Sequence, residues 1–205
     1  MITFILMTLF VVMSPGVDTA LITKRTIGDG KKDGLQMALG ITTGSLAHTL
    51  AATLGLSTLI LQSAVAFTIL KWAGAIYLIY LGIQAFINRK SPATATDSDN
   101  ILEKKGSAYK EGFLSNLLNP KVAVFFITFL PQFVTTAERA MIELFFMGSI
   151  YALLSILWFV FYVFCLHYIR EWLLSTTVQN YMEKLTGIVL IGFGIKLLFT
   201  QNESH

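Results

Sequence analysis

The chain has 205 residues, of which 55% are hydrophobic and 13% are charged, and its formal net charge is +3. Soluble domains carry about 25% charged residues, and the apolar residues here form long blocks rather than amphipathic stripes, which excludes an ordinary soluble domain. No basic stripe with interleaved aromatic residues is present, so nucleic-acid binding is not expected. The composition predicts an all-α integral membrane protein.

Six apolar stretches are each about as long as the roughly 20 residues that a membrane-spanning helix needs. In chain order they cover residues 2–23, 35–61, 66–87, 112–133, 141–167 and 181–199. The first stretch has no Lys or Arg before Lys24 and no small-residue cleavage site, so it is interpreted as a retained span and not as a signal peptide. The prediction is therefore about six transmembrane helices.

One connection between the predicted spans is much longer than the others. Residues 88–111 are polar, charged and rich in Ser, Thr and Ala, and such a segment cannot bury enough apolar surface to fold alone. It is interpreted as a linker between two halves of a single transmembrane domain that covers residues 1–205. The first half takes in about residues 1–90 and the second about residues 110–205.

Lys and Arg residues are concentrated on one side of the predicted membrane. The loop after the first span contains four of them, the linker five and the loop after the fifth span two, whereas the two loops on the other side contain only Lys71 and Arg139. Cytoplasmic loops carry such an excess of positive charge. The pattern predicts a protein of the cytoplasmic membrane with a cytoplasmic linker and with both termini outside.

Proline interrupts two of the predicted spans at similar positions of the two halves, at Ser14-Pro15 and at Asn119-Pro120. Proline removes a backbone donor and clashes with the preceding turn. Carbonyl groups that are freed at membrane depth must be satisfied by protein or by water in a cavity. The two breaks therefore indicate a polar cavity, and a kink that only eases helix packing is the alternative.

The third span of each half contains the same Lys-x-x-Gly pattern, which begins at Lys71 in the first half and at Lys184 in the second. With three spans in each half, the second half must insert upside down relative to the first. This predicts two inverted three-helix repeats in which helices 1 and 4 are broken at proline. Interrupted helices at matching positions of inverted repeats are typical of secondary transporters. The alternative is that short apolar helices resemble one another by chance.

Three motifs follow one another along the chain: SPGVDTALITKRTIGDGKKDGLQMALGITTGSLAHTLAATLGL, KWAGAIYLIYLGIQAF and GFLSNLLNPKVAVFFITFLPQF. Together they resemble the LysE/RhtB family of amino-acid exporters, and the resemblance covers the whole chain apart from the linker and the extreme C-terminus. It implies efflux of amino acids or related small metabolites by an antiporter that uses the proton gradient. The first-span motif of that family commonly reads Pro-Gly-Pro followed by Asn, whereas this chain has Pro15-Gly16-Val17-Asp18. The departure leaves the geometry of the break and the substrate open.

The two charged residues beside the breaks are the main candidates for a binding site. Asp18 is an acid inside a predicted span, a placement that costs several kcal/mol, so such residues usually face a cavity or a partner. The alternative is that Asp18 only caps the helix that starts after Gly16. Lys121 follows Pro120 and is expected to face the same cavity, where it binds a substrate carboxylate or pairs with Asp18. The alternative is that it reaches the cytoplasmic surface.

Two neutral candidates join these charges. Asn119 is expected to satisfy backbone groups freed at the second break or to bind the substrate. His48 lies on one helix face with Gly40 and Gly44, a G-x-x-x-G packing face, and is expected to make an interhelical hydrogen bond, with a proton relay as the alternative. The predicted substrate-binding or coupling residues are Pro15, Gly16, Asp18, His48, Asn119, Pro120 and Lys121.

The leading hypothesis is a secondary active exporter with a small-molecule substrate, protons as the coupling ion and the lipid bilayer as its surroundings; homo-oligomer formation is left open. A metal or inorganic-cation exporter or channel would need clustered ligands, and the three histidines, His48, His167 and His205, lack ligand spacing. A membrane-embedded enzyme would need paired acids or a nucleophile with its base, and a scaffold would not need broken helices. The sequence contains no Walker loop, and no cofactor or metal is expected.

Overall fold

The computed structural model describes residues 1–87 and 106–199, and every regular element within these residues is a helix. Their order is α1 (Ile2–Met13), α2 (Val17–Gly28), α3 (Lys31–Ala51), η1 (Ala52–Leu56), α4 (Ser57–Gln62), α5 (Ala64–Ile87), α6 (Ala108–Leu117), α7 (Pro120–Val124), η2 (Phe125–Phe129), η3 (Leu130–Phe133), η4 (Ala137–Arg139), α8 (Ala140–Leu174) and α9 (Thr176–Phe199). Of the short segments, η1 and η2 are π-helical and η3 and η4 are 3-10 helices. The predicted all-α class is confirmed.

The candidate membrane spans are of two kinds. Lys31–Gln62 and Ala137–Leu166 are each long and apolar enough to cross a membrane, whereas α1 with α2, and α6 with Pro120–Phe133, reach this length only across bends of 52° and 48°. By length and composition, the described residues therefore hold two candidate spans, or up to four if each bent pair is one span. Helices α5 and α9 have 24 residues each and lie where the third and sixth spans are expected. The count of six and the inverted relation of the halves stay predictions.

The predicted linker is only partly described. Residues 88–105 lie outside the described residues, and residues 108–111 form the first turn of α6 rather than part of the linker. Helix α8 similarly continues to Leu174, beyond the expected end of the fifth span at residue 167. A search for apolar residues finds only the lipid-immersed part of a helix, whereas the backbone hydrogen bonds continue into polar sequence.

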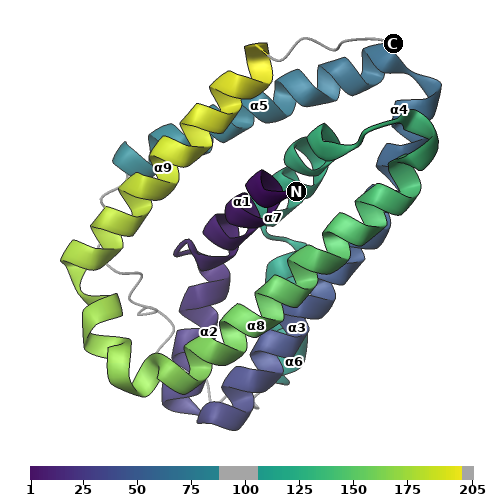
Figure 1. Cartoon of the computed structure of the whole chain (residues 1–205). Coiled ribbons are helices and arrows are strands. Elements are labelled where there is room, and N and C mark those ends of the chain that lie inside the picture. The colour runs from purple at the N-terminus through teal and green to yellow at the C-terminus, as the bar shows by residue number, and fades with distance from the viewer. Residues whose placement is uncertain (88–105, 200–205) are drawn as a thin grey trace.

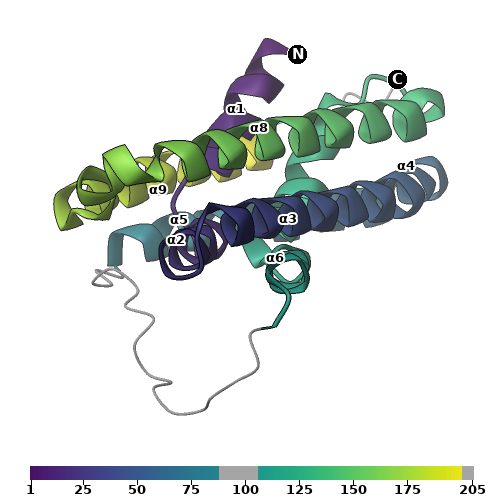
Figure 2. The same ribbon diagram turned by 90° about the horizontal axis from the view of Figure 1, so that it is seen from below.

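Close contact between helix backbones holds the bundle together. A Cβ atom at Gly40 would lie 2.1 Å from the Tyr109 carbonyl oxygen, and one at Gly112 would lie 2.4 Å from the Met37 carbonyl oxygen. Small residues permit such an approach between membrane helices, so α6 lies tightly against α3 (Figure 2). Figure 1 shows α5 and α9 side by side on the opposite flank from α3 and α8, with α1 and α7 between these pairs.

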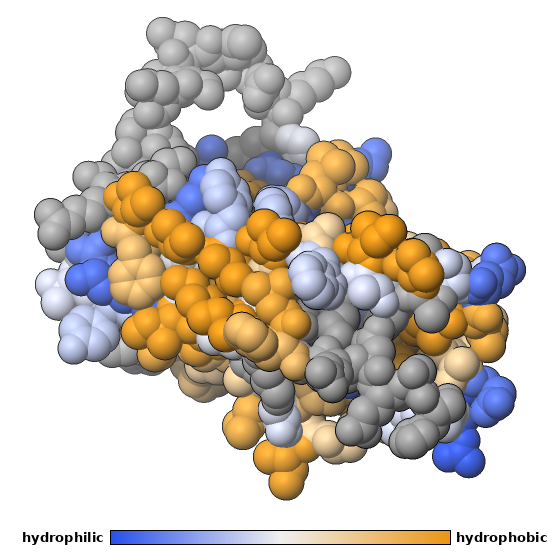
Figure 3. All heavy atoms as spheres, turned by 90° about the horizontal axis from the view of Figure 1, so that it is seen from above, coloured by the Kyte–Doolittle hydropathy of each residue, from blue (hydrophilic) through white to orange (hydrophobic). Residues whose placement is uncertain are grey.

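The outward faces of the helices are apolar. Ile2, Val65 and Ile142 are each more than 70% exposed, and apolar residues cover much of the face seen in Figure 3. Soluble monomers rarely leave large continuous apolar patches in water. In a bilayer the same side chains meet lipid tails while the helices satisfy their own backbone groups, so this surface belongs in a membrane.

Candidate functional site

Both helix breaks begin at the residue before a proline. Ser14 (φ −65°, ψ 135°) and Asn119 (φ −75°, ψ 111°) have extended backbones, because the following proline ring disfavours the helical conformation at the preceding residue. The chain resumes helical geometry at Val17 in the first half, and Pro120 is itself the first residue of α7. Proline is tolerated there because the first helical N–H has no intrahelical partner in any case.

Asp18 lies in the first turn of α2 and is only 8% exposed. Its Oδ1 accepts a hydrogen bond from Ser115 Oγ at 2.9 Å, and its Oδ2 accepts bonds from Asn116 Nδ2 at 2.9 Å and Asn119 Nδ2 at 3.2 Å. Within the described part of the chain, no backbone N–H donates to this carboxylate, so Asp18 is not a side-chain cap of α2. A buried carboxylate requires such donors, and all three come from the second half of the chain.

Lys121 extends from α7 back into the protein. Its Nζ donates to Ser14 Oγ at 2.9 Å, to the Ser14 carbonyl at 3.2 Å and to the Val11 carbonyl at 3.3 Å. These carbonyls belong to the C-terminal end of α1, where the intrahelical donors are missing. Gly16 makes room for the ammonium group, since a Cβ atom there would lie 3.2 Å from Lys121 Nζ. The lysine of one break therefore satisfies backbone groups of the other break.

The two opposite charges are close but separate. Asp18 and Lys121 line the same cavity, yet the ion pairs of the described residues do not include one between them. Lys121 Nζ points into the protein and donates to Ser14 and Val11 rather than to Asp18. Each charge has its own shell of neutral polar groups.

Asn119 connects the two charged residues. Its Oδ1 accepts the Lys121 backbone N–H at 3.0 Å and so caps α7. A backbone N–H can only donate, so this bond fixes the orientation of the amide and turns Nδ2 toward Asp18. The cap of one broken helix thus orients the carboxylate of the other.

His48 contacts Asn116, one of the residues that donate to Asp18. Its Nε2 lies 3.2 Å from the Asn116 carbonyl oxygen, and its ring stacks on Phe126 with 5.5 Å between the ring centroids. Ser45 Oγ donates to Asn116 Oδ1 at 3.2 Å. His48 therefore makes an interhelical hydrogen bond, and α3 fixes the asparagine that holds Asp18.

A small cavity lies between the breaks. Its volume of about 10 Å³ is close to the smallest space that holds one water molecule. Besides Asp18 and Lys121, the continuous helix α8 contributes Tyr151, Ser155 and Phe159, which are one turn apart on one helix face. A substrate larger than water needs the broken helices to move away from this continuous wall.

The sequence matches the profile of the LysE type translocator family over residues 9–201. The chain belongs to this family. Among its relatives, the uncharacterised membrane protein YrhP of Bacillus subtilis is 39% identical over 90% of this chain and 91% of its own length. The leucine efflux protein of Salmonella typhimurium is 27% identical over 98% of this chain and 95% of its own length. No solved structure is significantly similar to the chain.

The resemblance seen in the three motifs of this LysE type translocator is thereby confirmed. The structure brings six of the predicted site residues to the two breaks and leaves His48 one layer behind them. Ser115, which donates to Asp18, was not among the predicted site residues, and neither were Tyr151, Ser155 and Phe159 of α8. Helix α8 is apolar over most of its length and carries both Ser149 and Ser155, so its sequence alone does not mark the face that meets the cavity. In the described residues, no group of three or more His, Cys, Asp or Glu side chains is placed to hold a metal ion.

Proposed function

We propose that this LysE type translocator is a secondary active exporter of amino acids in the cytoplasmic membrane, with both termini outside. The observation that carries the proposal is the presence of Asp18 and Lys121 in one cavity without an ion pair between them. An amino acid carries an ammonium group and a carboxylate on one carbon atom, which complements two separate opposite charges. A relative named for leucine efflux supports the same class of substrate.

The proposed complex lies between the two broken helices. Asp18 holds the substrate ammonium group, while the Lys121 ammonium and the N-terminus of α2 hold the carboxylate, as the positive ends of half-helices do in other transporters. The three hydrogen-bond donors to Asp18 are neutral, so the carboxylate can still accept the substrate ammonium group or a proton. The substrate ammonium group and a proton compete for the Asp18 carboxylate, so one leaves when the other binds. This exchange couples export of the substrate to entry of a proton along its gradient.

The α8 wall is proposed to contact the substrate side chain. Tyr151, Ser155 and Phe159 are each at most 3% exposed, and the rings of Phe125 and Phe126 lie 5.0 Å from that of Tyr151. On the cavity face of α8, the large rings of Tyr151 and Phe159 therefore lie on either side of the smaller Ser155. Apolar amino acids fit such a wall better than charged ones, because a charged side chain would lose its hydration there.

Counterflow in proteoliposomes tests the proposed function. Vesicles preloaded with unlabelled leucine are expected to take up labelled leucine rapidly and saturably, whereas vesicles without protein or preloaded with glucose are not. An inward-directed and an outward-directed pH gradient should then drive net leucine movement in opposite directions. If none of the twenty protein amino acids shows counterflow, the proposal is wrong.

Ser155→Leu is expected to reduce leucine counterflow at least tenfold and alanine counterflow much less. The larger side chain fills the space between Tyr151 and Phe159, so only substrates with small side chains still fit. The measurement is the ratio of leucine to alanine counterflow rates. Ser149→Leu makes the same change on α8 outside the cavity lining and should leave the ratio unaltered. An equal loss for both substrates in Ser155→Leu would argue against this wall as the side-chain contact.

A further inference from the structure

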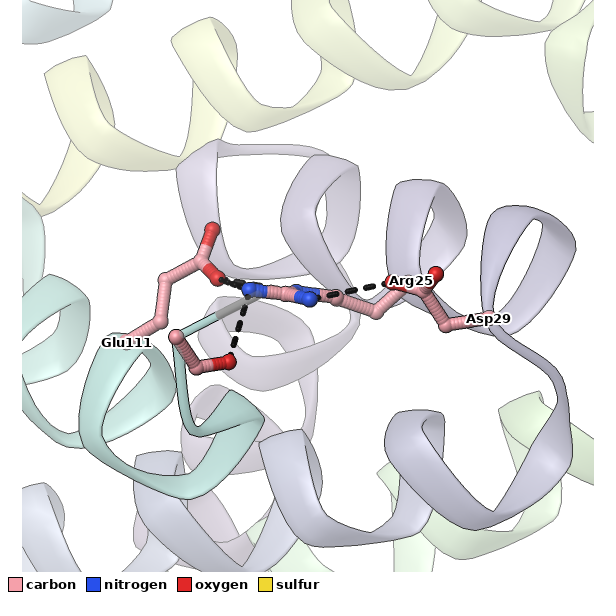
Figure 4. A network of polar contacts seen from close by, with 4 residues as sticks. Arg25, Asp29 and Glu111 are labelled. Atoms are coloured by element: carbon pink, nitrogen blue, oxygen red, sulfur yellow. Dashed lines mark hydrogen bonds and ion pairs between the residues drawn. The ribbon is translucent and has the colours of Figure 1, made fainter. Parts of the chain in front are cut away.

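A second polar contact joins the two halves of the chain beyond the cavity. Arg25 Nε donates to Glu111 Oε2 at 2.8 Å, Nη2 also donates to Glu111, and Nη1 donates to Asp29 Oδ2 at 3.0 Å (Figure 4). Nη2 reaches the Gly106 carbonyl at 3.3 Å as well. The Arg25 side chain is only 14% exposed. Both ion pairs of the described residues therefore meet at this one guanidinium group.

The Arg25–Glu111 contact and the Asp18–Ser115 contact of the candidate site lie along the same pair of helices, α2 and α6. Asp18, Ile22 and Arg25 share one face of α2, and Glu111 and Ser115 share one face of α6, at helical spacing. Helix α2 leads away from its break and α6 leads toward its own, so Asp18 meets Ser115 and Arg25 meets Glu111. Ile22 between them is fully buried. We call these five residues the α2–α6 seam; along α2 it extends about 10 Å from the cavity.

The α2–α6 seam has features that allow its two helices to separate. Helices α2 and α6 each adjoin a break, so either can tilt without disrupting a continuous helix. Helix α6 is held on α3 by the backbone contacts at Gly40 and Gly112. Helix α2 meets α3 and α8 through side chains instead, with Thr26 against Gly34 and Thr23 hydrogen-bonded to Tyr162 at 2.7 Å. A movement of α2 away from α6 must shift these side-chain contacts, whereas a movement of α6 must separate backbones. The ends of the seam are polar, and water can replace their hydrogen bonds when they separate.

The ion pairs of Arg25 with Asp29 and Glu111 allow α2 and α6 to separate repeatedly. Its carboxylate partner Glu111 belongs to α6, whereas Asp29 belongs to the α2 connection and moves with Arg25. When α2 moves away from α6, the Arg25 guanidinium therefore keeps its ion pair with Asp29. It avoids the cost of leaving a partly buried charge without a partner. Lys24, Lys31 and Lys110 lie near this end in the sequence, and the positive charges predict that it faces the cytoplasm.

We propose that the α2–α6 seam is the route by which the exported molecule enters from the cytoplasm, and that the Arg25–Glu111 ion pair is its gate. The gate is closed in this structure, in agreement with a cavity that holds no more than a water molecule. The proposal rests on the transport site described above. It does not depend on which molecule the site carries.

The proposed gate is tested by the rate at which a thiol in the cavity is labelled from each face of the membrane. Thr19 lines the cavity and Cys165 is the only cysteine of the chain, so Thr19→Cys with Cys165→Ser provides a single reporter thiol. Its reaction with a membrane-impermeant maleimide is followed in inside-out and right-side-out vesicles. Glu111→Gln is expected to raise the labelling rate from the cytoplasmic face at least fivefold and not to raise it from the outer face. Lys110→Gln, which removes an exposed charge from the adjacent residue, should change neither rate.

Arg25→Gln should raise the cytoplasmic labelling rate as much as Glu111→Gln does. The double variant Arg25→Gln with Glu111→Gln should raise it no further, because all three variants remove the same interaction. Unfolding temperatures of all variants are recorded in parallel. A pair that only stabilises the fold would lower the unfolding temperature and leave cytoplasmic labelling unchanged, or speed labelling from both faces. Either result would overturn the gate. A lack of amino-acid counterflow in the parent protein would refute the proposed substrate instead, and the labelling measurement would stand.

Discussion

Asp18→Asn is expected to weaken amino-acid binding about 10- to 100-fold without unfolding the protein. The new carbonyl oxygen can still accept from Asn116 and Asn119, and the new amide N–H can donate to Ser115, because a hydroxyl group both donates and accepts. What the variant loses is the negative charge. Hydrogen bonds to charged groups contribute about 1.5–3 kcal/mol, which corresponds to this loss of affinity. The half-saturation concentration of leucine counterflow measures it.

The same variant separates two roles of Asp18. If Asp18 holds the substrate ammonium group, the half-saturation concentration rises at every pH. If it only exchanges a proton, counterflow continues and export driven by a pH gradient is lost. Asp33→Asn is the matched control, since Asp33 also lies in the first turn of a helix and does not line the cavity. Unchanged counterflow and unchanged gradient-driven export in Asp18→Asn would end the functional claim for this carboxylate.

Lys121→Met is expected to lower leucine counterflow at least 100-fold and also to reduce the unfolding temperature. Methionine has a similar length but cannot donate, so the Val11 and Ser14 carbonyls at the end of α1 lose the ammonium that they share. A buried polar group left without a partner costs about 1–3 kcal/mol. The substrate carboxylate loses its cationic partner in addition. Counterflow and thermal unfolding in detergent are measured on the same preparations.

Lys110→Met serves as the control, because it makes the same change at an exposed position of α6. It should leave both the unfolding temperature and counterflow close to the parent values. A purely structural role of Lys121 has a different signature: the folded fraction of Lys121→Met would keep the parent half-saturation concentration while its unfolding temperature falls. That result would remove Lys121 from the binding site.

The sequence by itself determined the helices and the candidate positions of the breaks. A proline disfavours the helical conformation at the residue before it, and the extended backbones at Ser14 and Asn119 agree with this. Leu130 before Pro131 is nevertheless helical, so proline marks the candidate positions and the packing decides which of them break. Long apolar stretches mark α3 and α8 because a bilayer favours them wherever they occur. An acid in such a stretch is costly in any fold, and this made Asp18 a candidate before its neighbours were known.

Only the tertiary structure decided which groups meet. Ser115 donates to a carboxylate 97 positions earlier in the chain, and Arg25 pairs with Glu111 across the same helix contact. Hydropathy and periodicity cannot predict such pairs, because they describe each helix alone and say nothing of its partner or its rotation. The cavity face of α8 stayed hidden for a related reason. Lipid and protein core both favour apolar residues, so the face that carries Ser155 could be distinguished only after the helices had packed.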